Sequence, residues 1–241
     1  MTKVLLLCLC CLLVASSAFA TSTTCQTTTY DQYVAGNAGG SGVASCVTNA
    51  LTFSNFHYAA TAGGGASVVQ SSSVAVTPIQ TLGFEGFTFG ANWTATAGAS
   101  VDSTIYFTIS GPNLTDLHLN FNGSAAGVGS SAVVTEQFCL GGGDVTNCGS
   151  PLVTNNIVVT NIVNLSGPNT TIFDANTFFS PVTIIGVSKD IGVTAGTAPG
   201  SSAHISTVTN NFSNAAVPEP LSLVLLGTGL LGLGLLRKRI H

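Results

Sequence analysis

Residues 104–121 read TIYFTISGPNLTDLHLNF, and this stretch decides the fold class. Apolar side chains occupy every second position on both sides of a short break: Ile105, Phe107 and Ile109 before it, and Leu117, Leu119 and Phe121 after it. Alternation with a period of two predicts β-strands that bury one face in a core. The break, Ser110-Gly111-Pro112-Asn113, consists of turn-forming residues and predicts a hairpin turn between two strands.

Similar short runs recur along the chain, and the region between the two ends shows no helical periodicity of apolar residues. Turn-forming sequences separate the runs at Asn122-Gly123, at 141–144 and at 198–200. Many short strands joined by such turns predict an all-β fold, an antiparallel β-sandwich that is jelly-roll-like. No linker divides residues 21–216, so we expect one domain there.

Charge is scarce and unevenly distributed. Charged residues make up 6% of the chain, against about 25% in a typical soluble domain. Residues 21–217 contain a single base, Lys189, and eight acids. A nucleic-acid-binding protein needs clustered lysine and arginine side chains to displace counterions from phosphates, so that class of function is excluded.

Residues 1–20 have the three parts of a secretory signal peptide. Lys3 is the positive region, residues 4–14 form an apolar stretch too short to span a membrane, and Ala18-Phe19-Ala20 is the cleavage site. A lipoprotein signal is the alternative, but no pair of small residues precedes any of the three nearby cysteines, Cys8, Cys10 and Cys11. We therefore expect export and removal of residues 1–20.

The other end of the chain contains a second long apolar run. Val217-Pro218-Glu219-Pro220 is followed by uncharged, mostly apolar residues 221–236 and then by Arg237-Lys238-Arg239. As a helix the apolar run would be about 24 Å long, which predicts a short transmembrane helix. The basic tail would stay on the cytoplasmic side and leave residues 21–217 outside.

Residues 217–241 resemble a PEP-CTERM sorting signal, because the Pro-Glu-Pro motif, the apolar helix and the basic tail occur in that order. The resemblance implies recognition by an exosortase, a membrane-embedded protease or transpeptidase of Gram-negative bacteria that produce exopolysaccharide. It also implies that the tail anchors the protein in the inner membrane only transiently and is removed near the motif. The alternative is an ordinary C-terminal anchor that is never cut.

Four cysteines remain after removal of the signal peptide: Cys25, Cys46, Cys139 and Cys148. An even number in an oxidising compartment favours disulfides, and four cysteines allow three pairings. Local pairing, Cys25 with Cys46 and Cys139 with Cys148, is the preferred arrangement because each bond closes a short loop. The spacings do not fit the usual zinc sites.

The sequence contains no recognised catalytic motif: no nucleophile elbow, no zinc-protease helix, no phosphate-binding loop and no dinucleotide fingerprint. His57, His118 and His204 are more typical of isolated surface histidines than of a shared metal site. Trp93 is expected in the core, with a sugar-stacking platform as the alternative. Two loop pairs offer oxygen ligands for calcium, although turn capping explains them better: Asp144 with Asn147, and Asp174 with Asn176.

Lys189 and Asp190 are adjacent, and Lys189 is the single base left after processing. The simplest expectation is a solvated strand end with a weak surface ion pair. A crosslink between the lysine and a buried asparagine or aspartate is the alternative.

These observations predict a non-enzymatic exported protein of the cell surface or extracellular matrix, with a structural or adhesive role linked to exopolysaccharide. We assign it no catalytic residue, no metal site and no cofactor. Two alternatives remain: a carbohydrate-binding module, with or without calcium, and a secreted hydrolase that uses two of the eight acids.

Overall fold

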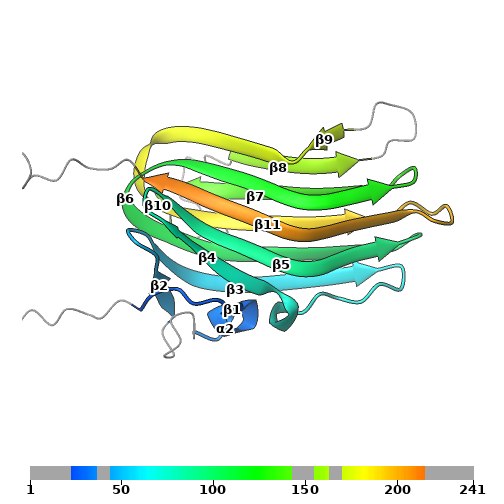
Figure 1. The fold of residues 1–241 in the computed structure, drawn as a ribbon, viewed down its shortest axis with the longest axis horizontal. Coiled ribbons are helices and arrows are strands. Elements are labelled where there is room, and N and C mark those ends of the chain that lie inside the picture. Colours follow the sequence, from blue (N-terminus) through cyan, green and yellow to red (C-terminus); the bar gives the residue numbers. More distant parts are fainter. Residues whose placement is uncertain (1–22, 37–43, 143–154, 163–169, 215–241) are drawn as a thin grey trace, which may run out of the picture.

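The computed structural model describes residues 23–36, 44–142, 155–162 and 170–214, most of which lie in antiparallel β-strands (Figure 1). The helical elements are α2 (Tyr30–Val34) and the 3-10 helix η1 (Ser71–Ser73). The strands are β1 (Thr28–Thr29), β2 (Ser45–Val47), β3 (Thr52–Gly63), β4 (Ala75–Thr81), β5 (Phe84–Thr96), β6 (Ser100–Ala126), β7 (Ser131–Leu140), β8 (Asn155–Ile162), β9 (Thr170–Ile172), β10 (Asp174–Thr194) and β11 (Ser202–Asn214).

Two long strands, β6 and β10, belong to both layers of a β-sandwich. Layer I has the order β2-β3-β6-β10-β7-β8-β9 and uses residues 100–110 of β6. Layer II has the order β1-β4-β5-β11-β6-β10 and uses residues 114–126 of β6. Figure 1 shows both long strands turning from one layer to the other at the left end of the molecule. The predicted antiparallel β-sandwich is therefore present.

The predicted hairpin turn at Ser110–Asn113 is wrong, because these residues lie inside β6. Asn113 adopts a positive φ of 49°, and the register with β10 shifts opposite this point. Glycine, proline and a left-handed asparagine thus bend one continuous strand instead of reversing the chain. Ser180-Pro181 of β10 lies within the facing register shift, so the two neighbouring strands bend together.

The predicted turn at Asn122-Gly123 is also wrong. Both residues lie in β6, where the register with β11 slips by one residue between Ile205 and Thr207. A Cβ on Gly123 would come within 2.7 Å of the His204 carbonyl oxygen, so the glycine allows the close approach at this bulge. The predicted turn at 198–200 is present, between β10 and β11.

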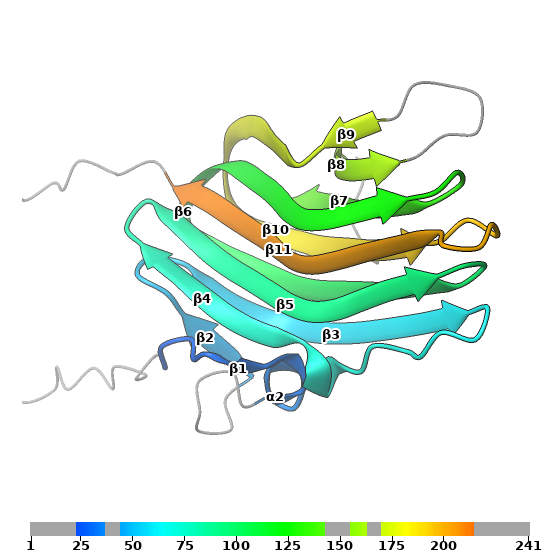
Figure 2. The ribbon, with the colours of Figure 1, turned by 45° about the vertical axis from the view of Figure 1, so that its right-hand side comes forward.

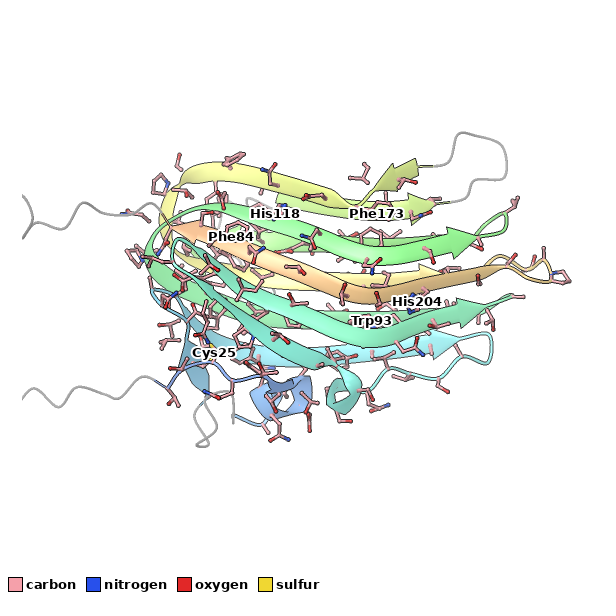
Figure 3. All side chains as sticks on the ribbon, in the orientation of Figure 1. Cys25, Phe84, Trp93, His118, Phe173 and His204 are labelled. Carbon is pink, nitrogen blue, oxygen red and sulfur yellow. A yellow bond between two sulfur atoms is a disulfide. The ribbon has the colours of Figure 1, made fainter. Side chains whose placement is uncertain are left out.

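Aromatic side chains from the two layers interlock to form the core. Phe53 of layer I packs against Phe87 of layer II with ring centroids 4.6 Å apart. Phe107 likewise meets Phe212 at 6.2 Å. Trp93 is fully buried and donates from Nε1 to Ser103 Oγ at 3.1 Å, which confirms its expected place in the core (Figure 3).

The N-terminal part of the described chain is tied to the sandwich by a disulfide. Cys25 is bonded to Cys46 of β2, as predicted, and both are buried. Figure 2 shows β1, β2 and α2 together at one edge of the sandwich. Cys139 is also disulfide-bonded, and its expected partner, Cys148, lies outside the described residues.

The predicted signal peptide and the whole of residues 217–241 lie outside the described residues, so the fold leaves both as predictions. Within the described ranges, no helix combines the length and the apolar character that a membrane crossing requires.

Two glycines on β5 provide a matched test of the layer II packing. A Cβ on Gly86 would lie 2.0 Å from the backbone oxygen of Asn210, whereas a Cβ on Gly90 would meet nothing closer than 3.8 Å. We expect Gly86→Ala to lower the free energy of unfolding by about 1–3 kcal/mol, because β5 or β11 must shift. Gly90→Ala should leave stability unchanged or slightly higher. Urea denaturation of both variants measures this, and equal stabilities would contradict the packing described.

Candidate functional site

A polar groove lies on the outer face of layer I, where three neighbouring strands run side by side. It has a volume of about 260 Å³ and is open to solvent. Its walls come from β6, β10 and β7, which contribute two residues each: Thr104 and Tyr106, Ser188 and Asp190, and Thr135 and Gln137. Every lining side chain carries a hydroxyl, amide or carboxyl group.

Strand register arranges the lining residues in two rows across the sheet. Tyr106, Ser188 and Gln137 are directly opposite one another in one row. Thr104, Asp190 and Thr135 form the next row, because residues two apart on a strand point to the same face. The alternation that buries Ile105 and Val187 therefore also presents these polar groups outward.

A hydrogen bond from the core side of the sheet holds the backbone of Tyr106 in place. Its backbone carbonyl accepts a hydrogen bond of 2.7 Å from the hydroxyl of Tyr30, a fully buried residue of α2. This contact occurs where the register between β3 and β6 shifts, between Ser54 and His57. His57 is exposed and directly opposite Tyr106, so it extends the first row toward β3.

Two carboxyl groups meet beside the second row. Asp190 lies next to Asp102, which is opposite Gly192 on the same strand as Asp190. Partial burial raises the pKa of Asp190 to about 6, and the Asp102 charge and a hydrogen bond with Asp102 act in the same direction. Asp190 therefore keeps its proton in mildly acidic solution, where an ordinary aspartate has lost it.

The three histidines singled out in the sequence lie apart. His118 Nε2 is hydrogen-bonded to Asp174 on the outer face of layer II, and Asp174 is one of the residues whose oxygens were weighed as calcium ligands. Figure 3 shows His204 farther along the sandwich, on β11. In the part of the chain that the structure describes, no three histidine, cysteine or acidic side chains are grouped as metal ligands. Asp144 and Asn147 lie outside it.

The expectation that Lys189 is a solvated strand end is wrong. Lys189 is completely buried and paired with Glu136, whereas its neighbour Asp190 faces outward. The signal was present in the sequence, because Lys189 is in phase with Val187 and Ile191 in the apolar alternation. The groove had no such signal, since its six residues come together only through the strand register.

No family model and no curated protein sequence matches this chain. Among solved structures, TmCBM61 in complex with beta-1,4-galactotriose is 10% identical with a TM-score of 0.27, covering 64% of this chain and 86% of that one. A carbohydrate-binding module of Cellvibrio mixtus lichenase 5A in complex with cellotriose is 16% identical with a TM-score of 0.21, covering 58% and 87%.

A third similar structure is the enzymatically active domain of tailspike protein 4 from bacteriophage CBA120. It is 18% identical with a TM-score of 0.26, covering 66% of this chain and 19% of that one. TM-scores in this range transfer neither a family nor a ligand to this chain.

The carboxyl pair predicts a specific pH dependence of stability. The folded-state pKa of Asp190, about 6, lies above its ordinary value of 3.8, so the folded protein binds this proton more tightly than the unfolded chain does. The contribution of Asp190 to the free energy of unfolding is therefore fully present below the ordinary value and is lost as pH rises to about 6. We expect Asp190→Asn to remove this decline in urea denaturation measured across that range. An unchanged decline would contradict the pairing of Asp190 with Asp102.

Proposed function

We propose that this protein binds a neutral carbohydrate in the outer groove of layer I. The observation that carries the proposal is the lining of that groove, which consists of hydroxyl, amide, phenol and carboxyl groups from three adjacent strands. Such groups both donate and accept hydrogen bonds, which is what the hydroxyls of a sugar require. The ring of Tyr106 adds an apolar face on which a pyranose can lie. The volume of about 260 Å³ suits a short stretch of a longer chain.

Charge supports a neutral ligand. The single lysine or arginine among the described residues, Lys189, points into the core and offers nothing to an anion. Asp190 and Asp102 give the groove a negative charge above the pKa of Asp190. A sulfated or uronic-acid polymer would be repelled by these carboxylates, whereas a neutral polysaccharide would not.

The carboxyl pair favours binding over hydrolysis. Asp102 and Asp190 hydrogen bond to each other, whereas the two catalytic carboxyls of glycosidases flank the scissile bond about 5–10 Å apart. We therefore propose a binding role and no enzymatic activity for this groove.

Binding is tested by affinity electrophoresis in gels that contain soluble polysaccharides. The panel consists of a neutral glucan, galactan and mannan, the exopolysaccharide of the producing cells, and polygalacturonate as the anionic comparison. We expect retardation by at least one neutral polymer and none by polygalacturonate. Gln137→Ala should weaken the binding about tenfold, since it removes one or two hydrogen bonds to the sugar.

The matched control is Gln70→Ala, because Gln70 is exposed and lies just before η1, outside the groove. It should bind as the unmodified protein does. Equal retardation of the Gln137 and Gln70 variants would place the binding site elsewhere, and no retardation by any neutral polymer would contradict the proposal.

The proposed setting is the cell surface or extracellular matrix. The predicted signal peptide supports export, and the Pro-Glu-Pro motif with its apolar and basic tail supports processing by an exosortase. Buried disulfide-bonded cysteines suit an oxidising compartment. A groove for neutral sugars would then hold the released protein within exopolysaccharide, which gives it a structural or adhesive role.

Processing is tested by the intact mass of protein recovered from its natural host. We expect a chain that begins at Thr21, ends near Pro218–Pro220 and lacks the apolar tail. Replacing all three residues Pro218, Glu219 and Pro220 with alanine should leave the tail in place and the protein in the membrane fraction. A mass that extends to His241 in the unmodified protein would instead indicate a permanent anchor.

A further inference from the structure

Three polar side chains occupy positions in the sandwich core that would normally be apolar. Lys189 lies on β10, Glu136 on β7 and Asn210 on β11, and all three are 0% exposed. Each is flanked, two residues away on either side of its strand, by core side chains: Val187 and Ile191, Val134 and Phe138, and Val208 and Phe212. Alternation therefore directs all three into the same interior.

The three side chains converge on the Glu136 carboxyl. Lys189 is directly opposite Glu136 in the strand register, and its Nζ donates to Glu136 Oε2. Asn210 reaches the same carboxyl from layer II, since its side chain forms a hydrogen bond that lowers the pKa of Glu136. One carboxyl thus contacts both an amine and a carboxamide.

The cluster is incompletely satisfied. The Asn210 amide nitrogen donates to the His118 backbone carbonyl at 3.2 Å, but Asn210 Oδ1 has no hydrogen-bond partner among the described residues. Glu136 Oε1 lacks one as well. Buried polar atoms without partners are rare in folded proteins and call for an explanation. Protonation of Glu136 would supply a donor for the Asn210 oxygen.

Burial favours the uncharged forms of both ionisable groups. Loss of hydration lowers the pKa of Lys189 and raises that of Glu136, while their mutual attraction acts in the opposite direction. A lysine in such a site is more readily deprotonated to a nucleophilic amine, and the carboxyl beside it can take the proton.

We propose that Lys189 and Asn210 form an intramolecular isopeptide bond, with Glu136 carrying the proton. Glu136 takes a proton from Lys189, and the neutral Nζ attacks Cγ of Asn210. The bond from Cγ to Nδ2 then breaks as the leaving nitrogen is protonated through Glu136. The products are a secondary amide that links the two side chains and one ammonium ion, and Glu136 returns to its carboxylate form. No oxidant, reductant or other reactant takes part.

The bond would join β10 in layer I to β11 in layer II through the centre of the sandwich. It would also replace the buried amine with a neutral amide, which removes the need to desolvate a charge. The interior position protects the reacting groups from water, so hydrolysis would not compete with amide formation.

The decisive measurement is the mass of the full chain, without substitutions, after folding. We expect it to be lower than the sequence and its disulfides require by one ammonia, about 17 Da. Digestion with chymotrypsin should release one branched peptide that contains both Lys189 and Asn210. The branched peptide is needed because a succinimide at Asn122-Gly123 would lose the same mass without any crosslink.

Glu136→Gln keeps the size of the side chain but cannot accept the proton, so this variant should retain its full mass. Asn211→Ala is the matched control, because Asn211 is the next residue on β11 and is also buried but lies outside the cluster. It should still lose one ammonia. The proposal would be overturned if the folded protein without substitutions retained its full mass and Lys189 and Asn210 were recovered only in separate linear peptides.

Discussion

The structure depends on the shared bend of β6 and β10. Each strand pairs within layer I along one half and within layer II along the other, so the bend determines where the two layers face each other. The bend relies on Ser110–Asn113 in one strand and Ser180-Pro181 in the other. Without this bend, the two halves of β6 would lie in a single flat sheet, and their apolar faces could not pack against each other.

Alternation in the sequence predicted the fold class and most of the core, because a strand with one buried face must place apolar residues at every second position. The same rule identified Trp93 as a core residue. It did not predict the long strands, since glycine, proline and asparagine serve equally well in a hairpin turn and in a bend. Ser110–Asn113 and Asn122-Gly123 were both mistaken for turns on that account. The tertiary pairing of β6 overrode the local signal.

The groove could not be predicted from the sequence, for a different reason. Tyr106, Ser188 and Gln137 are distant in the chain, and only the register of three strands makes them neighbours. The burial of Lys189, by contrast, could have been predicted from the sequence. Alternation places Lys189 in phase with apolar neighbours, but charged side chains are almost never fully buried, so the sequence analysis predicted an exposed lysine.

Adjacent residues of β10 connect the two sites. Lys189 points inward to Glu136 while Asp190 points outward into the groove, so the strand that lines the groove is also the strand held at the core. The same is true of β7, where Glu136 lies between Thr135 and Gln137. Any displacement of these strands would separate Lys189 from Glu136, which is costly because it leaves buried polar groups without partners. The interior cluster thereby fixes the register on which the sugar-facing rows depend, and rigid strands lower the entropy lost when a ligand binds.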